Sequence, residues 1–301
     1  MSFIVILGVV AALAGIAYAN GPRLLDALTS RTGYSVERDI AYDDLPRRTL
    51  DLYRPDFGID TAPLIVFFYG GAWSNGSKNL YRFVAEPFAS RGFVVAVPDY
   101  RLFPEVTFPG FVEDGAEAVA HLWRTLRKTD GSARQLILIG HSSGAHLAAL
   151  LAVDRRYLTA AGVPPDAIAA VVGMSGPYDF LPLTQAKYER IFPAASRAAS
   201  QPIAFVDGEQ APMLLLTGDA DTTVDPGNSA RLAERIRKTG GEVLLKAYPG
   251  VGHVGMILAL ASASPFRKPP ALADILAFVA AQLQRAASSS SHSGQSKSPV
   301  S

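Results

Sequence analysis

Six short, almost continuously apolar runs lie between residues 63 and 248, and they limit the fold more than any other feature of the sequence. Runs of this length with little polar alternation are typical of strands buried on both faces of a sheet. Helical patterns stand between them, for example at residues 111–128 and 227–240. Strand and helix in alternation predict an α/β fold with a mainly parallel, doubly wound sheet and helices on both faces. The six runs are PLIVFFY (63–69), FVVAVPDY (93–100), QLILIGHS (135–142), IAAVVGMS (168–175), PMLLLTG (212–218) and EVLLKAY (242–248).

Two earlier segments, SVERDIAY (35–42) and RTLDLYRP (48–55), exchange polar and apolar residues along their length. This alternation predicts an antiparallel pair of strands near the start of the chain. No repeat of fixed period and no linker-like change in composition appears between Asn20 and Ala287, which favours one domain. In sheets of this kind the ligand site lies beyond the carboxyl ends of the strands, so functional residues are expected directly after the runs.

The overall composition excludes several classes of function. The chain has 28 Lys and Arg against 27 Asp and Glu, and this near balance gives no basis for binding nucleic acid. It has no cysteine, which excludes disulfides, thiolate catalysis and zinc–thiolate sites. No pair of histidines or carboxylates has metal-ligand spacing on a predicted element, so we expect no metal and no cofactor.

The first nineteen residues, MSFIVILGVVAALAGIAYA, differ from the rest of the chain. An apolar stretch from Phe3 to Ala17 runs into Ala17-Tyr18-Ala19, the small-x-small form of a signal-peptidase site. The stretch is also close to the ~20 residues that span a bilayer, and no Lys or Arg precedes it. We therefore expect residues 1–19 to be a signal peptide or a membrane anchor, and the protein to be exported (periplasmic or extracellular) or held at a membrane by this segment. At the other end, the Ser-rich residues 288–301 predict a disordered tail.

A nucleophile motif follows the third of the six runs. Gly140-His141-Ser142-Ser143-Gly144 stands between the predicted strand QLILI and the helical pattern AHLAALLAV, and it has the form G-x-S-x-G. In this strand-to-helix turn the serine takes a strained backbone conformation that lifts its Oγ above the sheet. The helix N-terminus then points toward negative charge that develops near the serine. The motif predicts that Ser142 is a catalytic nucleophile.

A serine nucleophile needs a base to take its proton, and five histidines are available. His253 lies in the Gly-rich loop that directly follows the last strand run, at the edge of the sheet where the base is required. The other four stand elsewhere: in the G-x-S-x-G turn and the helix after it (His141 and His146), on the helical segment 111–128 (His121) and in the Ser-rich tail (His292). We predict that His253 is the base.

The base in turn needs a carboxylate that holds its tautomer and stabilises the imidazolium. The loop after residues 212–218 contains three candidates, Asp219, Asp221 and Asp225, and spacing alone does not choose among them. Asp225 precedes a proline and has the position of a helix cap, while Asp219 stands in the turn itself. Asp221 is therefore our prediction, and it preserves the chain order Ser…Asp…His of this type of site.

Acyl transfer at such a serine creates an oxyanion that needs preorganised N–H donors. One donor is the backbone N–H of Ser143, the residue after the nucleophile. The others are expected from the loop Tyr69-Gly70-Gly71-Ala72-Trp73 after the first run, where glycines allow the backbone to approach a substrate closely. We predict an oxyanion hole made by Gly71, Ala72 and Ser143, with Trp73 as a wall of the pocket.

These motifs together resemble the α/β-hydrolase superfamily, in its esterase/lipase branch with an H-G-G-x-W oxyanion loop. The resemblance is carried by YGGAWSNGSK, ASRGFVVAVPDYRL, FPGFVEDGAEAV and LIGHSSGAHLAAL, and GDADTTV and PGVGH extend it to about residue 253. Bacterial carboxylesterases, acetyl- and feruloyl-esterase-like proteins, kynurenine formamidases and plant isoprenylcysteine methylesterases are similar. The resemblance implies an α/β-hydrolase fold over residues 20–287, with a short cap insertion at about 177–211.

Two positions qualify the resemblance. Tyr69 stands where the family usually has His, and its phenol is expected to brace the oxyanion loop by a hydrogen bond with a different reach. Asp114 corresponds to a residue with a structural role at a helix start in the family, so it is left out of the site. For the substrate pocket we predict Tyr69, Trp73 and, from the cap, Tyr178.

The resemblance implies a serine hydrolase that cleaves carboxylic esters, with small or short acyl groups, through an acyl-enzyme. An arylformamidase-type amide hydrolase would use the same residues, and a non-catalytic binding module could be built on the same fold. The expected partner is a small-molecule ester, with no nucleic acid and with membrane association through residues 1–19. Motifs do not encode the natural substrate or the oligomeric state.

Overall fold

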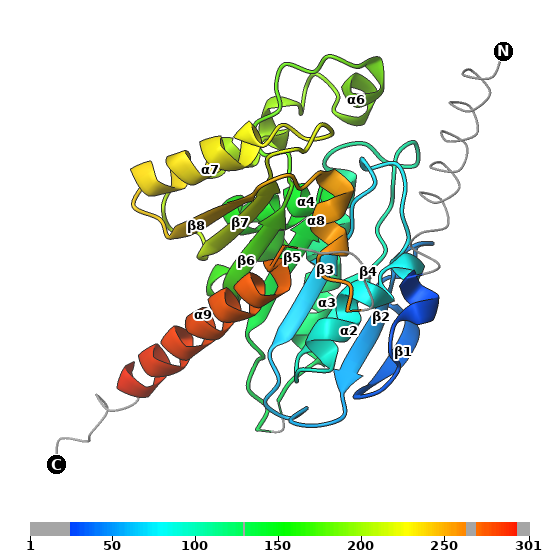
Figure 1. Ribbon diagram of the computed structural model, residues 1–301, viewed down its shortest axis with the longest axis vertical. Helices are drawn as coiled ribbons and strands as arrows, with labels where there is room; N and C mark the ends of the chain where they lie inside the picture. The colour runs from blue at the N-terminus through cyan, green and yellow to red at the C-terminus, as the bar shows by residue number, and fades with distance from the viewer. Residues whose placement is uncertain (1–24, 129, 263–268, 294–301) are drawn as a thin grey trace.

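The computed structural model describes residues 25–128, 130–262 and 269–293. Its centre is one eight-stranded sheet with the strand order β1-β2-β4-β3-β5-β6-β7-β8 (Figure 1). The strands are β1 (Tyr34–Ala41), β2 (Thr49–Pro55), β3 (Leu64–Phe68), β4 (Val94–Pro98), β5 (Leu136–His141), β6 (Ile168–Met174), β7 (Met213–Gly218) and β8 (Val243–Tyr248).

The sequence-based prediction of the sheet is confirmed strand by strand. β1 pairs with β2 and β2 pairs with β4 in antiparallel fashion, whereas the pairs from β4 through β8 are all parallel. Each of the six apolar runs forms one of the strands β3 to β8. β3, β4, β5 and β7 are buried at every residue, which explains why these runs lack polar alternation. β8, at the edge of the sheet, is partly exposed.

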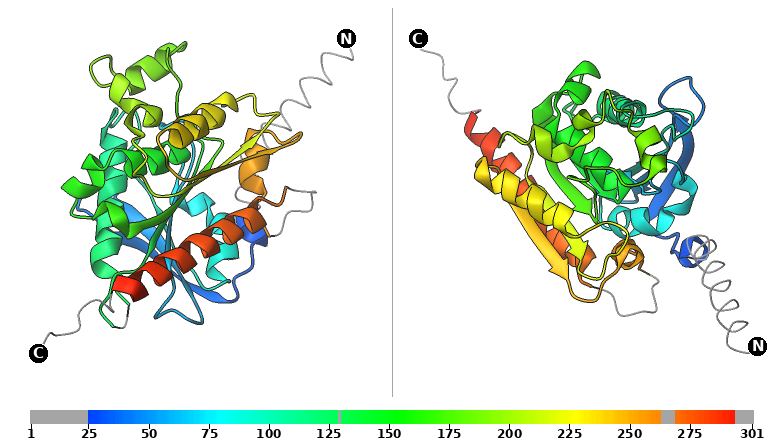
Figure 2. Two further views of the ribbon diagram at one scale, coloured as in Figure 1. Left: turned by 90° about the vertical axis from the view of Figure 1, so that its left-hand side faces the viewer. Right: turned by 90° about the horizontal axis from the view of Figure 1, so that it is seen from above.

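Helices cover both faces of the sheet, as an α/β-hydrolase fold requires. α2 and α9 pack on one face and α3 and α4 on the other, while α7 packs against β7 and β8 (Figure 2). α4 is buried along its whole length, so its sequence SGAHLAALLAV is apolar all round rather than amphipathic. The longer helices are α2 (Arg82–Ala89), α3 (Gly110–Thr125), α4 (Ser143–Val153), α7 (Gly227–Lys238) and α9 (Ala271–Ser293), and the shorter ones α5 (Arg156–Ala160), α6 (Ala186–Ile191) and α8 (His253–Leu258).

The strand register brings the ends of distant segments together at one edge. In the β3–β5 pair, Phe68 is the partner of Gly140, so the loop after β3 and the turn after β5 emerge side by side. In the β7–β8 pair, Gly218 is the partner of Tyr248, so the acidic loop and the Gly-rich loop also emerge as neighbours. Because all four segments leave the carboxyl ends of parallel strands, they meet on the same edge.

The segment between β6 and β7 forms the predicted cap region. It contains α6 and two short 3₁₀ helices, η3 (Ala198–Ser200) and η4 (Pro202–Phe205). In Figure 1 this segment rises above the carboxyl edge of the sheet, beside the start of α7. It therefore lies on the side of the molecule where the predicted site residues emerge.

The two ends of the chain are described only in part. Residues 1–19, predicted as a signal peptide or membrane anchor, lie outside the described residues, and within the described ranges no helix is long and apolar enough to cross a membrane. The predicted disordered tail at 288–301 starts too early, because α9 continues to Ser293. The Ser288 hydroxyl donates to the Gln284 carbonyl at 3.0 Å, so serines here continue a helix already formed by the preceding turns. Residues 294–301 lie outside the described part.

Candidate active site

The turn between β5 and α4 holds Ser142 in a strained conformation, with φ +56° and ψ −125°. The flanking glycines are required by space. A Cβ on Gly140 would lie 2.2 Å from the Gly144 carbonyl oxygen, and a Cβ on Gly144 would lie 2.0 Å from the Phe68 carbonyl oxygen. Such strain costs about 1–3 kcal/mol and persists only where the surrounding structure enforces it. Here the result is a serine side chain lifted above the end of the strand.

Three side chains from three loops form a hydrogen-bonded chain at this edge. Nε2 of His253 lies 2.9 Å from Oγ of Ser142, and Nδ1 of His253 lies 2.8 Å from Oδ2 of Asp221. The Asp221 side chain is fully buried, while that of His253 is 12% exposed. These distances are those of a nucleophile bonded to its base and of a base bonded to its orienting carboxylate.

The hydrogen bonds to Asp221 favour its ionised form. Burial alone would raise its pKa, but the Val224 backbone N–H and the His253 side chain outweigh burial, so its pKa lies below the usual value. Its second oxygen accepts the backbone N–H groups of Thr223 and Val224, each at 2.9 Å. The other two candidate carboxylates bond elsewhere: Asp219 accepts the Gly250 N–H at 2.6 Å, and Asp225 accepts the Gly227 N–H at 2.9 Å at the start of α7.

Two other histidines lie near Ser142 but serve different contacts. His141 is buried, which lowers its pKa to about 3, and its Nε2–H donates to the His253 backbone carbonyl at 3.1 Å. His146 is also buried, which lowers its pKa to about 4, and it bonds Trp73 and Ser200. Both imidazoles are therefore neutral at neutral pH, and neither makes a hydrogen bond with the Ser142 hydroxyl.

The loop after β3 comes very close to Ser142. A Cβ on Gly70 would lie 2.9 Å from the Ser142 Cβ, so no larger residue fits there without movement. Ala72 and Trp73 then take left-handed conformations, with φ +51° and +55°. In the described part of the chain, the backbone N–H groups of Gly71, Ala72 and Ser143 form no hydrogen bond. Unpaired N–H groups beside the Ser142 hydroxyl are the arrangement that an oxyanion hole requires.

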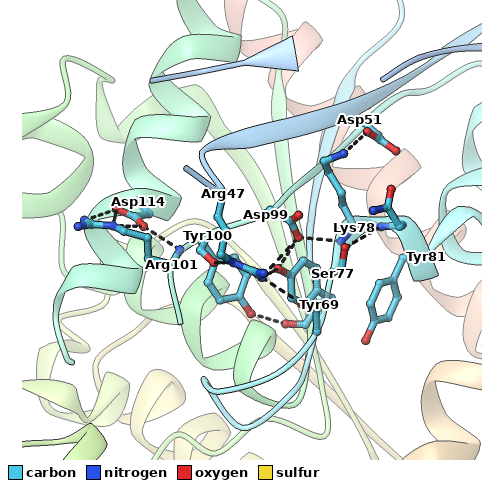
Figure 3. A network of polar contacts seen from close by, with 12 residues as sticks. Arg47, Asp51, Tyr69, Ser77, Lys78, Tyr81, Asp99, Tyr100, Arg101 and Asp114 are labelled. Carbon is cyan, nitrogen blue, oxygen red and sulfur yellow. Dashed lines mark hydrogen bonds and ion pairs between the residues drawn. The ribbon is translucent and has the colours of Figure 1, made fainter. Parts of the chain in front are cut away.

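A buried polar network holds the base of this loop (Figure 3). The Tyr69 hydroxyl donates to Oδ1 of Asp99 at 2.6 Å, and the same oxygen accepts the Lys78 backbone N–H at 2.8 Å. The Tyr100 hydroxyl donates to the Tyr69 carbonyl oxygen at 2.7 Å. The Tyr69 ring also packs under Gly76, where a Cβ would lie 2.6 Å from the ring. Both ends of the loop are therefore tied to the residues that follow β4.

Arg47, from the connection between β1 and β2, completes this network. It donates from Nη2 to the Tyr69 hydroxyl at 3.2 Å and to the Gly76 carbonyl at 3.0 Å, and from Nε to the Tyr100 carbonyl at 3.2 Å. The tyrosine that replaces the family's histidine thus braces the loop through a carboxylate and a guanidinium (Figure 3). Asp114 lies apart from this network, fully buried in ion pairs with Arg48 and Arg101.

A cavity of about 370 Å³ opens beside Ser142. One part of its wall is apolar and comes mainly from the loop after β3 and from the cap, while a second part is polar and includes the guanidinium of Arg231. Arg231 bonds Oδ2 of Asp179 at 2.6 Å and lies 3.3 Å from Oδ2 of Asp225. The apolar part is formed by Trp73, Pro177, Phe180, Pro182, Leu183 and Tyr188, and Ala72 and Ser143 line the cavity next to Ser142.

Two of the three predicted pocket residues are not on this wall. Trp73 lines the cavity, but Tyr69 and Tyr178 are fully buried and do not line it. Tyr69 faces down into the network with Asp99 rather than outward. Tyr178 packs at the end of β6, where a Cβ on Gly173 would lie 2.0 Å from its hydroxyl. The prediction for these two tyrosines is wrong because an aromatic residue near a site can fill the layer beneath it.

The structure also places residues at the site that sequence reasoning missed. The sequence contained a usable signal for Asp99, because this residue directly follows a buried strand at the carboxyl edge of the sheet. Arg47 and Arg231 had none, because each stands outside the motifs that carry the resemblance. The position of His146 on the helix was recognised, but its two bonds could not be read from the sequence.

Known proteins are similar to this chain in sequence or in fold. An isoprenylcysteine α-carbonyl methylesterase of Arabidopsis thaliana is 28% identical over 245 residues, covering 74% of this chain and 57% of the plant protein. A kynurenine formamidase of Danio rerio is 32% identical over 146 residues, covering 48% of this chain and 47% of that protein. The chain thus spans about half to three fifths of the length of these curated relatives. The solved structure of esterase B from Lactobacillus rhamnosis matches with a TM-score of 0.77 at 20% identity, covering 97% of this chain and 99% of that chain.

The structural match confirms the α/β-hydrolase fold, and the two relatives confirm the resemblance to methylesterases and formamidases. A model of the family BD-FAE matches residues 50–236. The matched range includes the loop after β3, the turn at Ser142 and the acidic loop with Asp221, and it ends before His253. On this match, the chain belongs to the BD-FAE family.

Proposed function

We propose that the protein is a serine hydrolase that cleaves carboxylic esters through an acyl-enzyme. The observation that carries this proposal is the bonded chain from Oγ of Ser142 through His253 to Oδ2 of Asp221, at 2.9 and 2.8 Å. This hydrogen-bonded series of side chains lies beside a cavity and next to unpaired backbone N–H groups. This arrangement supports acyl transfer, which needs an activated hydroxyl and donors for an oxyanion at the same point.

In the proposed reaction Oγ of Ser142 attacks the ester carbonyl carbon while Nε2 of His253 takes the hydroxyl proton. The N–H groups of Gly71, Ala72 and Ser143 bind the oxyanion, and Asp221 stabilises the imidazolium. The C–O bond to the alcohol then breaks, and His253 gives its proton to the leaving oxygen. Water next attacks the acyl-enzyme with His253 again as base, which releases the acid and returns the proton to Ser142.

The cavity supports esters of modest size. A volume of about 370 Å³ is at the small end of the range of ligand pockets. Its apolar wall suits a short acyl or aryl group, and its polar part around Arg231 suits a hydrated end of the substrate. We therefore propose small or short-chain acyl esters as substrates.

Hydrolysis of p-nitrophenyl esters from C2 to C12 by the full-length protein tests this function. Activity on the short esters that is absent in Ser142→Ala would support it, and a fluorophosphonate should label the wild type but not the variant. If the wild type neither hydrolyses any ester nor reacts with the fluorophosphonate, the non-catalytic binding module becomes the better account.

A second candidate, hydrolysis of an aryl formamide, is favoured by the similarity to kynurenine formamidase. It would use the same three side chains, so mutation of the site cannot separate the two reactions. An aryl formamide and the matching aryl formate ester should be compared at equal concentration. A larger kcat/KM for the formamide would replace the ester by the amide as the proposed substrate.

We also propose that residues 1–19 direct the protein out of the cytoplasm, either as a cleaved signal peptide or as a membrane anchor. Expression of the full chain in a bacterial host, followed by fractionation and mass measurement, tests this. A soluble exported form that begins near Asn20 supports cleavage, whereas an intact form in the membrane fraction supports anchoring. An intact form in the cytoplasm would contradict both.

A further inference from the structure

His146 is a buried histidine that the proposed reaction does not use. It lies on α4 four residues after Ser142, and it is fully buried. A buried imidazole requires partners for its polar atoms, since an unpaired buried group costs about 1–3 kcal/mol. The hydrogen-bond partners of His146 show which parts of the structure it connects.

The two ring nitrogens of His146 have partners of opposite kind. The Trp73 indole Nε1–H donates to Nδ1 at 3.2 Å, and Nε2 lies 2.7 Å from the Ser200 carbonyl oxygen. An indole N–H can only donate and a carbonyl can only accept, so Nδ1 must accept and Nε2 must carry the proton. Only one neutral tautomer satisfies both contacts. His146 therefore links the oxyanion loop to the cap.

The first arm of this link ends on a wall of the cavity. Trp73 lines the cavity, and its ring packs edge-on against His146, with ring centres 5.2 Å apart. Phe192 and Tyr188 also meet the indole edge-on, at 4.8 and 6.0 Å. The bond to His146 selects one orientation of the indole within this aromatic group, because packing alone is weakly directional.

The second arm ends on another residue of the apolar wall, Phe180. Ser200 accepts from His146, and its hydroxyl accepts from Nε2 of Gln201 at 2.8 Å. Oε1 of Gln201 accepts the Phe180 backbone N–H at 2.8 Å, and the Phe180 ring lines the cavity. The Phe180 and Trp73 rings lie 5.8 Å apart. Both aromatic walls are thus tied to the same imidazole.

We infer that His146 is a positioning residue that sets the width of the apolar subsite and so selects the size of the acyl or aryl group. This inference rests on the proposed function for its kinetic readout, but the position of Trp73 can be measured without activity. A histidine that only filled space would affect folding without affecting the choice between short and long substrates.

Three variants separate these roles. In His146→Gln, the amide can accept from Trp73 through its oxygen and donate to Ser200 through its nitrogen. In His146→Leu, both hydrogen bonds are lost while an apolar side chain fills the space. Gln201→Leu cuts the arm to Phe180 and leaves His146 unchanged, so it tests the link even where His146→Leu does not fold.

The kinetic readout is the ratio of kcat/KM for p-nitrophenyl hexanoate to that for the acetate, per active site titrated with a fluorophosphonate. We expect His146→Leu to raise this ratio about tenfold, the discrimination that one or two methylenes give in an apolar pocket. Gln201→Leu should change it in the same direction, and His146→Gln should stay within about threefold of the wild type. Ratios for both Leu variants equal to that of the wild type would overturn the inference.

The second readout is the fluorescence of Trp73. The chain has two tryptophans, so Trp123→Phe leaves Trp73 as the single tryptophan, excited selectively above the absorption of tyrosine. In that background, acrylamide quenching should increase in His146→Leu and Gln201→Leu and remain unchanged in His146→Gln. If the wild type has no esterase activity, the proposed function fails while this quenching still tests the position of Trp73. Unchanged quenching in both Leu variants would show that the indole does not depend on His146.

Discussion

Nε2 of His253 lies 2.9 Å from Oγ of Ser142, although 111 residues separate them along the chain. Three parallel strand pairs, β5–β6, β6–β7 and β7–β8, produce this distance. β5 ends at the serine turn, and β8 ends at the Gly-rich loop before α8, on the same edge of the sheet. The hydrogen bond depends on the strand order of the sheet rather than on any local segment. Substitutions near it have specific expected effects.

Asp221→Asn should lower kcat by about 10⁴-fold with little change in KM, because an amide cannot hold the His253 tautomer or stabilise the imidazolium. Steady-state kinetics on a short p-nitrophenyl ester measure the effect. Asp219→Asn is the matched control, since Asp219 accepts the Gly250 N–H outside the cavity and an amide oxygen can do the same. A larger loss in Asp219→Asn than in Asp221→Asn would mean that the wrong carboxylate has been chosen.

Tyr69→Phe should lower kcat by roughly 10- to 100-fold, because the loop that carries Gly71 and Ala72 loses the hydroxyl that binds Asp99. The change should also reduce the free energy of unfolding by about 1–3 kcal/mol, since buried Asp99 loses a donor. Kinetics and urea unfolding together measure both effects.

Tyr42→Phe is the control for this tyrosine. The Tyr42 hydroxyl donates to the backbone carbonyl of Asp99 at 2.7 Å, in a buried position away from the cavity. We expect a similar loss of stability with kcat close to the wild type. Equal loss of kcat in both variants would indicate a general effect of destabilisation instead of a specific brace on the loop.

Gly71→Ala should abolish most activity, because the new Cβ would lie 2.0 Å from the Asn75 carbonyl oxygen and would displace the loop. Gly162→Ala has a similar backbone cost, with φ +81° and open space around the new Cβ. Both variants should lose about 1–2 kcal/mol of stability from the positive φ, and the clash in Gly71→Ala adds to its loss. Activity per titrated active site distinguishes them, and an active Gly71→Ala would exclude Gly71 from the oxyanion hole.

The protein should lose stability in mild acid because of its buried neutral histidines. Burial lowers the pKa of His146 to about 4 and that of His141 to about 3, from an ordinary value of 6.5. Between these values the unfolded chain binds more protons than the folded chain, so the free energy of unfolding falls as the pH decreases from about 7 toward 4. For His146 the loss is about 3 kcal/mol at the lower pH.

Urea unfolding of the wild type and of His146→Gln at pH 7 and pH 4.5 measures this dependence. The amide does not titrate, so the variant should lose less stability than the wild type over the same interval. An identical loss in the two proteins would show that His146 does not titrate with a lowered pKa.

The sequence by itself determined the strands, their alternation with helices and the identity of the elbow. These features depend on local patterns: an apolar run long enough for a buried strand, and two glycines at fixed distance from Ser142. The order of the runs, together with the resemblance, also predicted which histidine and which carboxylate to consider. A strand buried on both faces needs an apolar residue at nearly every position. The run therefore predicts the strand even when the neighbouring strands are unknown.

The tertiary structure alone decided which side chains meet. Three carboxylates in one loop had equal claims by spacing, and the structure brings Asp221 to His253 while Asp219 and Asp225 bond backbone N–H groups. Tyr178, expected on the pocket wall, is buried at the end of β6. The partners of Arg47 and His146 lie tens of residues away in the sequence. Such contacts depend on strand register and helix packing, which join residues that no local pattern connects.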